Sequence, residues 1–366
     1  MLRRRRPAPR GEPAPHRRRG LPARPRVAAA LLVVLSLAGC ALEVQRLRPA
    51  PFTAYQRPQA GFTAEEIAWI EDNCGPFGAP TLTPEWPHGP TAFVVREGYV
   101  LRHSSVDKIA LWVCEHVEPG ELQGDARRRD DFDPDPELEP GQRAELADYR
   151  GSGYDRGHEA PAGNQKASQR LNDETFFLSN MIPQEPGNNR QVWRELEKLT
   201  RDWVAEGVVP SAWIVTGGFF YDPDEEDEAT ADGLIPFQAI GDNQVSVPTH
   251  VYKVVLARRG PAPADPEAPP DPEHPTGPEH AGDAEDPDDP AGEPGAGSSE
   301  GEPPFRAVAF VLENRPYERP FRFEDHVRSV RWIEERTGLD FFPDLVDPLV
   351  AEELEARKGS LWSEEP

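Results

Sequence analysis

Asp155-Arg156-Gly157-His158 is followed, about thirty residues further on, by Asn189 and then by Trp193, Leu196 and Glu197. A free imidazole titrates near pH ~6.5, so His158 is largely neutral at working pH and can act as a general base. Asn189 offers an amide oxygen, which suits Mg²⁺, an ion often held by few protein ligands while it keeps several waters. Glu197 follows in a segment with helical spacing and can hold such a water.

Three arginines could act together with these residues. Arg201 follows Glu197 by four residues, so a helix places both on one face. Arg156 and Arg128 supply further planar, permanently charged donors, which suit a phosphate group. A phosphodiester repels an attacking hydroxide and has a poor leaving group, so its hydrolysis needs a base, a cation and donors of this kind. The residue types therefore point to cleavage of a phosphodiester.

These motifs, with Ser179-Asn180-Met181-Ile182-Pro183-Gln184 between them, resemble the DNA/RNA non-specific endonuclease family. The resemblance covers roughly residues 85–345 apart from one insertion. It implies an α+β fold of the ββα-metal (His-Me finger) type with a mixed or antiparallel sheet. It also implies DNA and RNA as substrates, cleavage that leaves 5′-phosphates, and Mg²⁺ as the cofactor, with Mn²⁺ as the alternative ion.

The resemblance also implies individual roles. His158 is the expected general base, Asn189 the sole direct metal ligand, and Glu197 acts through water. Arg156 and Arg201 are expected to bind the phosphate in its transition state. A further family arginine precedes an Asp-x-Phe segment, and here the choice between Arg128 and its neighbour Arg129 stays open.

Plainer interpretations accompany these roles. Asn189 could serve as a helix N-cap, a role that is compatible with metal binding. Trp193 and Leu196 are expected to pack in the core rather than to stack on bases. The run Arg127-Arg128-Arg129 has acidic neighbours, so a salt-bridged surface loop is a rival to a phosphate site.

The first 40 residues have the features of a targeting segment. An arginine-rich start is followed by apolar Val27 to Leu37, which is too short to span a bilayer as a mature helix. Leu37-Ala38-Gly39-Cys40 resembles a bacterial lipobox, so Cys40 is the expected lipidation site. An ordinary cleaved signal is the alternative. Lipidation predicts an extracytoplasmic protein anchored to a bacterial membrane, facing the periplasm or the cell surface.

Two of the three cysteines, Cys74 and Cys114, remain if Cys40 carries lipid. An even pair in an oxidising compartment predicts a disulfide, with free thiols as the alternative. Such a bond would pin an N-terminal extension to the sheet.

One domain is expected over residues 61–345, preceded by a tether over 41–60 and followed by a C-terminal tail over 346–366. The sequence predicts a capped helix over 64–73, a hairpin over 91–103 and a helix over 189–206. Further strands are predicted over 109–117, 213–220, 245–257 and 305–313, and a further helix over 328–336. Residues 260–304 are acidic and rich in proline, with almost no large apolar residue, so a disordered insertion within the domain is expected.

The formal net charge of −25 is at odds with a nucleic-acid substrate. Removal of the segment before Cys40, with its ten arginines and one glutamate, would make the chain more negative still. Thirteen acidic residues lie in the insertion, outside the expected fold. The cleft must therefore be locally positive, and we expect weak, salt-sensitive substrate binding.

Two classes of function follow. The first is a lipid-anchored, Mg²⁺-dependent endonuclease for DNA and RNA. The second is a catalytically silent surface lipoprotein that uses the nuclease fold to bind nucleic acid or protein. An enzyme for another phosphoester is a third interpretation. The sequence identifies neither an inhibitor protein nor an oligomeric state.

Overall fold

The computed structural model describes residues 62–83, 89–227, 230–259 and 304–362, together with the backbone of two short strands at 32–34 and 42–47. The expected lipidation site Cys40 and nearly all of the insertion 260–304 lie outside the described residues. Among the described residues, no helix combines the length and the apolar character needed to cross a bilayer. The targeting segment, the tether and the domain boundaries remain predictions.

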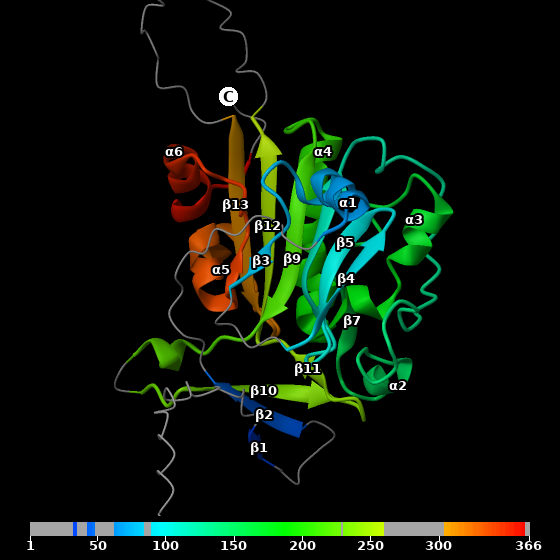
Figure 1. Cartoon of the computed structure of the whole chain (residues 1–366), viewed down its shortest axis with the longest axis vertical. Coiled ribbons are helices and arrows are strands. Elements are labelled where there is room, and N and C mark those ends of the chain that lie inside the picture. Colours follow the sequence, from blue (N-terminus) through cyan, green and yellow to red (C-terminus); the bar gives the residue numbers. More distant parts are fainter. Residues whose placement is uncertain are drawn as a thin grey trace, which may run out of the picture.

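A seven-stranded antiparallel sheet forms the centre of the fold (Figure 1). Its strand order is β14-β13-β12-β9-β6-β5-β4. The strands are β4 (Thr91–Arg96), β5 (Tyr99–Ser104), β6 (Ala110–Val117), β9 (Ala212–Phe219), β12 (His250–Arg258), β13 (Phe305–Glu313) and β14 (Val327–Arg328). β12 and β13 are paired along their whole length, so the chain that leaves at residue 259 returns at 304 to the neighbouring strand. The insertion thus connects two adjacent strands of one sheet.

Side chains alternate along these strands, so the sheet has two buried faces. On one face, Ile214 belongs to a core that includes Trp193. On the other face, Val215 belongs to a core that includes Ile70 of α1 (Ala64–Cys74) and Ile333 of α5 (Val330–Thr337). Helices therefore cover both faces, with α1 and α5 on one and α4 (Arg194–Ala205) on the other (Figure 1).

Smaller elements surround the large sheet. A four-stranded sheet with the order β1-β2-β10-β11 lies below it in Figure 1. Its strands are β1 (Leu32–Val34), β2 (Leu42–Leu47), β10 (Leu234–Ile240) and β11 (Val245–Val247). The two-stranded sheets are β3 (Thr81–Leu82) with β15 (Leu339–Asp340), and β7 (Asp155–His158) with β8 (Met181–Gln184). The short helices are α2 (Leu146–Tyr149), α3 (Gln169–Glu174) and α6 (Pro348–Ala351).

Most predicted elements are confirmed within a few residues. The helix α1 begins at the predicted cap, where Thr63 and Glu66 form a reciprocal capping box. The predicted strand over 245–257 is wrong as a single element, because β11 ends before Pro248 and β12 begins after Thr249. Proline lacks the N–H that a ladder requires, which explains the interruption.

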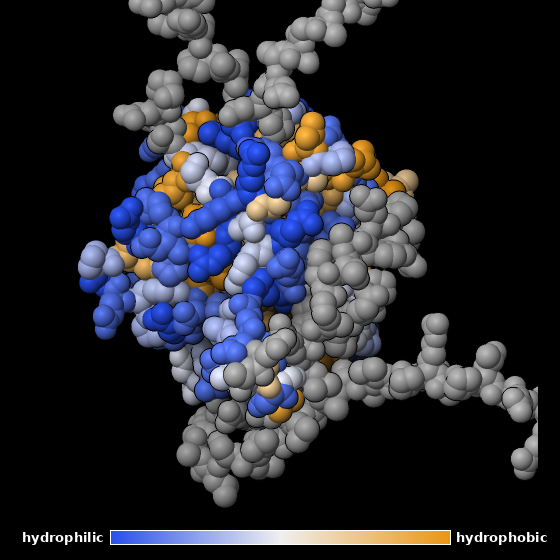
Figure 2. Space-filling view, turned by 90° about the vertical axis from the view of Figure 1, so that its left-hand side faces the viewer, coloured by the Kyte–Doolittle hydropathy of each residue, from blue (hydrophilic) through white to orange (hydrophobic). Residues whose placement is uncertain are grey.

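Packed residues continue beyond position 345, into the predicted tail. A helical turn at Glu352–Ala356 follows α6, and Leu354 is buried. Trp362 packs against Trp203 of α4, with ring centroids 4.6 Å apart. Hydrophilic residues dominate the side of the molecule that carries α5 and α6, with hydrophobic residues scattered among them (Figure 2).

The two cysteines lie together in one core. Cys74 at the end of α1 and Cys114 on β6 are both buried in the same cluster. Burial, and next an interaction with the Cys74 side chain, raise the pKa of the Cys114 thiol well above its usual value. The structure records both as free thiols, so their disulfide stays a prediction.

Candidate active site

β7, β8 and α4 form a compact ββα unit around the predicted motifs. Its two strands pair antiparallel, with His158 opposite Met181. The chain then enters a helical turn, 188–193, which leads directly into α4. Residues far apart in the sequence therefore meet at one place, as the resemblance implies.

The turn before α4 differs from the predicted regular helix. Residues 188–193 form a π-helical turn, and only from Arg194 is the helix α-helical. The backbone N–H of Asn189 donates to the carbonyl oxygen of Glu185, at 2.9 Å. Single π turns are rare and occur often at functional sites. Asn189, the expected metal ligand, lies in this turn.

Gly157, between Arg156 and His158, is required by a close approach. A Cβ atom at this position would lie 2.0 Å from Oε1 of Gln184 on the paired strand. No side chain fits there unless β7 and β8 move apart. The glycine of the motif therefore keeps the strand of the expected base in place.

The His158 ring is fixed by aromatic neighbours. Ring centroids lie 5.1 Å away at Phe176 and 5.9 Å away at Phe132. Indole Nε1 of Trp193 donates to the backbone oxygen of His158, at 3.2 Å. The ring atom Nε2 is buried and has no hydrogen-bond partner among the described residues. The imidazole is thus held firmly in one orientation.

The environment of His158 favours the neutral ring. Burial, and next the charges of Arg128 and Arg156, together lower its pKa to about 3. A neutral imidazole with an unengaged nitrogen can accept a proton, which is the chemistry of a general base.

Guanidinium groups line an adjoining cavity of about 550 Å³. Its lining residues are Arg128, Asp130, Phe132, Leu146, Tyr149, Arg150, Tyr154, Asp155, Arg156 and Asn189. The guanidinium carbon of Arg156 lies 4.0 Å above the Phe132 ring, so cation–π contact orients it. Three arginines outnumber the two aspartates of this lining, so its formal charge is positive although the whole chain is acidic.

Arg128 and Arg129, which the sequence does not separate, have different surroundings. Arg128 lines the cavity and lies over Phe176, although its Nε also pairs with Asp130 at 2.7 Å. Arg129 pairs instead with Asp173, at 3.1 Å. The geometry therefore favours Arg128 as the arginine that faces a phosphate.

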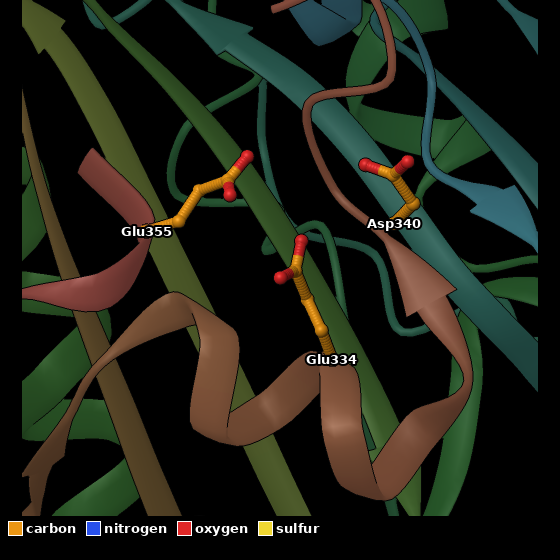
Figure 3. A group of neighbouring side chains, drawn as sticks. All are labelled: Glu334, Asp340 and Glu355. Carbon is orange, nitrogen blue, oxygen red and sulfur yellow. The ribbon is translucent and has the colours of Figure 1, made fainter. Parts of the chain in front are cut away.

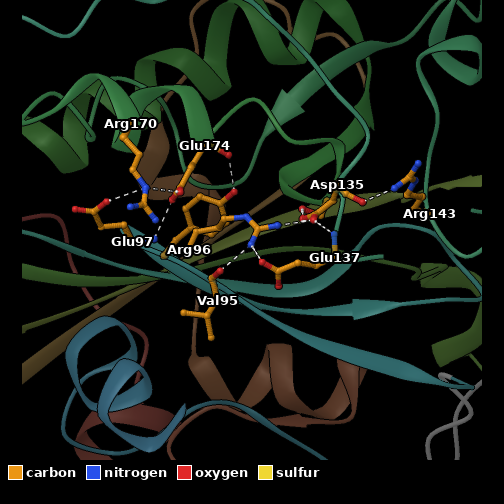
Figure 4. A network of polar contacts seen from close by, with 10 residues as sticks. Val95, Arg96, Glu97, Asp135, Glu137, Arg143, Arg170 and Glu174 are labelled. Atoms are coloured by element: carbon orange, nitrogen blue, oxygen red, sulfur yellow. Dashed lines mark hydrogen bonds and ion pairs between the residues drawn. The ribbon is translucent and has the colours of Figure 1, made fainter. Parts of the chain in front are cut away.

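A buried ion-pair network holds the loop that carries Arg128. Arg96 of β4 contacts Asp135 and Glu137 of this loop (Figure 4). Ser179, just before β8, donates to the same Asp135 carboxylate at 2.5 Å. The network ties the loop both to the large sheet and to the ββα unit. A buried charge requires such pairing, since burial alone is costly.

Asn189 is oriented by Asp155, at the start of β7. Its amide Nδ2 donates to Asp155 Oδ2 at 2.9 Å, and Arg190 forms two further bonds to the same carboxylate. Burial works to raise the pKa of Asp155, but the bonds from Arg190 and Asn189 outweigh it and leave the pKa lowered. Asp155 is thus held by Arg190 as well as by Asn189.

The predicted pair Glu197 and Arg201 lies on α4, outside the cavity lining. Arg201 donates to Oδ1 of Asn164 at 3.1 Å. Burial raises the pKa of Glu197, while the charges of Lys253, Arg201 and Arg128 oppose that rise. The charge of Arg128 thus lowers the pKa of His158 and opposes the rise in the pKa of Glu197.

Two further features are missed by sequence reasoning. Lys253 of β12 is buried with its Nζ 5.2 Å from the ring centroid of Trp193, and no spacing in the sequence signals this contact. On the opposite face of the sheet, Glu334, Asp340 and Glu355 have carboxylate oxygens within 4.8 Å of one another (Figure 3). Burial, and next the Glu355 charge, raise the pKa of Glu334 to about 8. No sequence spacing signals this acidic group.

Comparisons with known proteins identify the family of this chain. The family model described as DNA/RNA non-specific endonuclease matches residues 80–272. Mitochondrial endonuclease G of Homo sapiens is 42% identical over 162 residues, which are 44% of this chain and 53% of that protein. The mitochondrial nuclease EXOG of Homo sapiens is 38% identical over 173 residues, which are 46% of this chain and 45% of that protein. This chain thus spans about half the length of these relatives.

A solved structure shares the fold. The crystal structure of the EndoG/EndoGI complex matches with a TM-score of 0.56 and 24% identity, over 78% of this chain and 95% of that chain. The predicted α+β, ββα-metal fold is thereby confirmed. Because the family model covers more than half of the 366 residues, this chain belongs to the DNA/RNA non-specific endonuclease family.

Proposed function

We propose that this protein is a divalent-metal-dependent endonuclease that hydrolyses phosphodiester bonds of DNA and RNA, with His158 as general base. The observation that carries the proposal is the neutral, fixed imidazole of His158, which contacts Phe132 of a cavity lined by three arginines and whose Nε2 has no hydrogen-bond partner among the described residues. Nuclease relatives support the reaction class.

His158 takes a proton from the attacking water in this proposal. Its low pKa keeps the ring neutral through physiological pH, so the acceptor nitrogen is present in nearly every molecule. Contacts with Phe132 and Phe176 hold the ring, which limits the reorganisation needed at the moment of proton transfer.

Arg128 and Arg156 bind the scissile phosphate from the cavity. Both remain charged at all relevant pH values and present planar donors to phosphate oxygens. Charge that develops on these oxygens in the transition state strengthens the contacts. Arg201 on α4 is a third donor to the phosphate in this proposal. Its hydrogen bond to Asn164 already holds it in place.

The residues present fit a hard divalent cation. Asn189 lines the cavity, and its Nδ2 is occupied by Asp155, which leaves the oxygen Oδ1 as the available donor. An oxygen ligand of this kind suits Mg²⁺ or Mn²⁺. Bound there, the ion would supply positive charge next to the phosphate and the leaving oxygen. Glu197 would order water around it.

The substrate enters a locally positive cavity on an acidic protein. Long-range repulsion slows the encounter with nucleic acid, while the cavity arginines attract phosphates at short range. Binding through phosphates suits both DNA and RNA, because both carry the same phosphodiester group and phosphate contacts carry no base information.

We further propose that Cys40 carries the lipid that anchors the enzyme outside the cytoplasm of a bacterium. The lipobox-like sequence at 37–40 supports it. The test is metabolic labelling with a fatty-acid analogue. Label should be lost in Cys40→Ser, and equal labelling of both proteins would refute the anchor.

A digestion assay tests the nuclease proposal. The full-length chain, purified in detergent, receives plasmid, single-stranded DNA or RNA together with Mg²⁺. All three should be degraded, and His158→Asn should lose about 10²- to 10⁴-fold in rate, the usual contribution of a general base. His326→Asn, a histidine remote from the cavity lining, is the matched control. Absence of digestion by the unmodified protein would favour the silent binding module instead.

A further inference from the structure

The Phe176 ring contacts two residues of the candidate active site that come from different parts of the chain. Phe176 follows α3 and has an exposed fraction of 1%. The imidazole of His158, from β7, meets this ring in a T-shaped arrangement, with centroids 5.1 Å apart and an interplanar angle of 87°. The guanidinium carbon of Arg128 lies over the same ring, 5.1 Å from its centroid. One buried phenyl group therefore contacts both the expected base and an expected phosphate donor.

Phe132 extends these aromatic contacts to a second arginine of the cavity. Its ring centroid lies 5.1 Å from that of Phe176, again in a T-shaped arrangement. The guanidinium carbon of Arg156 lies 4.0 Å from the Phe132 centroid. T-shaped ring pairs and cations over a ring are both favourable, because the face of the ring is partly negative and its edge partly positive. The two rings thus connect both arginines to the His158 imidazole.

The backbone of Phe176 attaches the loop that carries Arg128. The N–H of Asp133 donates to the carbonyl oxygen of Phe176 at 3.3 Å. The N–H of Leu178 donates in turn to the carbonyl oxygen of Asp133 at 2.9 Å. The chain then continues into β8, which pairs with the strand of His158. Ring and backbone of Phe176 therefore both connect the Arg128 loop to the ββα unit.

The contact with Phe176 distinguishes Arg128 from Arg129. The two side chains are equally exposed, at 54%. Each pairs with one aspartate, at 2.7 Å for Arg128 and 3.1 Å for Arg129. Among the described residues, an aromatic ring lies against the guanidinium of Arg128 but not against that of Arg129. A long, exposed side chain samples many rotamers, so this ring restricts where the Arg128 guanidinium can lie.

We propose that Phe176 is a positioning residue of the nuclease site, whose ring fixes the Arg128 guanidinium relative to the His158 imidazole. The inference rests on the proposed nuclease function, in which His158 activates the water that attacks the phosphate bound by Arg128. Base and phosphate donor must then be correctly spaced at the same moment. A misplacement of about 1 Å can cost on the order of 10²-fold in rate. Phe176 contacts both groups and itself makes and breaks no bond.

The order of the Arg128 side chain tests the proposal in the unmodified protein. ¹⁵N relaxation of the arginine Nε–H groups is measured on the full-length chain in detergent, without metal or nucleic acid. Arg128→Lys and Arg129→Lys assign the two signals. The order parameter should be clearly higher at Arg128 than at Arg129, and in Phe176→Leu it should fall to the level of Arg129. Equal order at both arginines in the unmodified protein would overturn the proposal, even if Phe176→Leu does not fold.

Coupling in activity gives a second readout. Phe176→Leu, Arg128→Ala and the double variant are compared by kcat/KM on DNA with Mg²⁺. Phe176→Leu should lose about 10-fold in the unmodified background and at least about 3-fold less when Arg128 is already alanine, because the effects of contacting residues are not additive. Phe341→Leu is the matched control, since Phe341 is equally buried, at 1%, in the core that contains α1 and α5. It should change kcat/KM little.

Two results in activity would show that Phe176 only fills space. They are an equal loss from Phe176→Leu in both backgrounds, and a loss of the same size in Phe341→Leu. Either result overturns the proposal, provided that urea unfolding shows each protein to be folded at the assay temperature. Failure of the nuclease proposal is seen separately, as unmodified protein that does not digest DNA while the order of Arg128 is still measurable.

Discussion

The side-chain amide of Asn189 is anchored by Asp155, with Nδ2 2.9 Å from the carboxylate oxygen Oδ2. Nitrogen and oxygen are the two branches of one planar amide, so this bond directs Oδ1 away from Asp155. Arg190 holds the carboxylate in turn through two bonds, at 2.7 and 2.6 Å. The metal-ligand candidate is therefore oriented before any ion binds.

Loss of this anchor should weaken metal binding. We expect Asp155→Ala to need about 10- to 100-fold more Mg²⁺ for half-maximal DNA cleavage, the usual cost of removing a partner that orients a ligand. Asp155→Asn keeps an oxygen that can accept from Asn189 and should lose less. Asp173→Ala, which releases Arg129 and Gln169, is the control. Equal Mg²⁺ requirements for all four proteins would contradict the orienting role.

Arg128 should be far more important for DNA cleavage than its neighbour Arg129. Arg128 lines the cavity, whereas Arg129 pairs with Asp173. We predict that Arg128→Ala lowers kcat/KM on DNA about 100-fold, the range seen when a donor to a developing negative charge is removed. Arg129→Ala should change it little. The measurement is initial rates at several salt concentrations, and a larger loss in Arg129→Ala would reverse the assignment.

The sequence was sufficient to predict the ββα unit and the start of α1, whereas their surroundings depend on long-range contacts. The order of His158, Asn189 and Glu197 indicated the ββα unit, and the capping box at Thr63 indicated where α1 begins. The π turn before α4 follows from docking against Asp155 and Glu185, which helical periodicity does not report.

Lys253 illustrates why the rest was not predictable. A single lysine in an apolar run resembles an exposed edge position or an isolated surface charge. Its partners, Thr216 and Glu115, come from strands that are distant in the sequence, and only the β6-β9-β12 order brings them together. The Glu334, Asp340 and Glu355 group depends in the same way on tertiary packing.

The buried pair of Arg96 and Asp135 should be important for stability. Arg96→Met leaves the Asp135 carboxylate buried without its cation, so we expect a loss of about 3–5 kcal/mol in unfolding free energy, typical of a broken buried pair. Urea unfolding followed by tryptophan fluorescence measures it. Arg170→Met provides the matched control in the same region, because Arg170 pairs with Glu97 and Glu174 in solvent (Figure 4). Its unfolding midpoint should hardly move, and an equal shift in both variants would refute the distinction.

The low pKa of His158 should affect the pH dependence of the free energy of unfolding as well as that of activity. Folding depresses this pKa from 6.5 to about 3, with burial as the main cause. Below pH 6.5 the unfolded chain binds a proton that the folded chain rejects, so unfolding becomes easier as pH falls toward 3. His158→Asn should lose part of this dependence, measured by urea unfolding at several pH values.

Other buried histidines also have lowered pKa values. The contribution of His158 therefore has to be measured as the difference between His158→Asn and the unmodified protein. Burial also lowers the pKa of His103 and His250, each to about 4. These residues remain in His158→Asn, and the difference from the unmodified protein isolates the imidazole at 158. The same depressed pKa means that the base stays neutral well below pH 6.5, so the acid limb of kcat/KM should not have its midpoint there. The free energy of unfolding of His158→Asn could instead run parallel to that of the unmodified protein from pH 7 to 4. The folded ring would then accept protons normally, and the argument that the base is neutral throughout this range would fail.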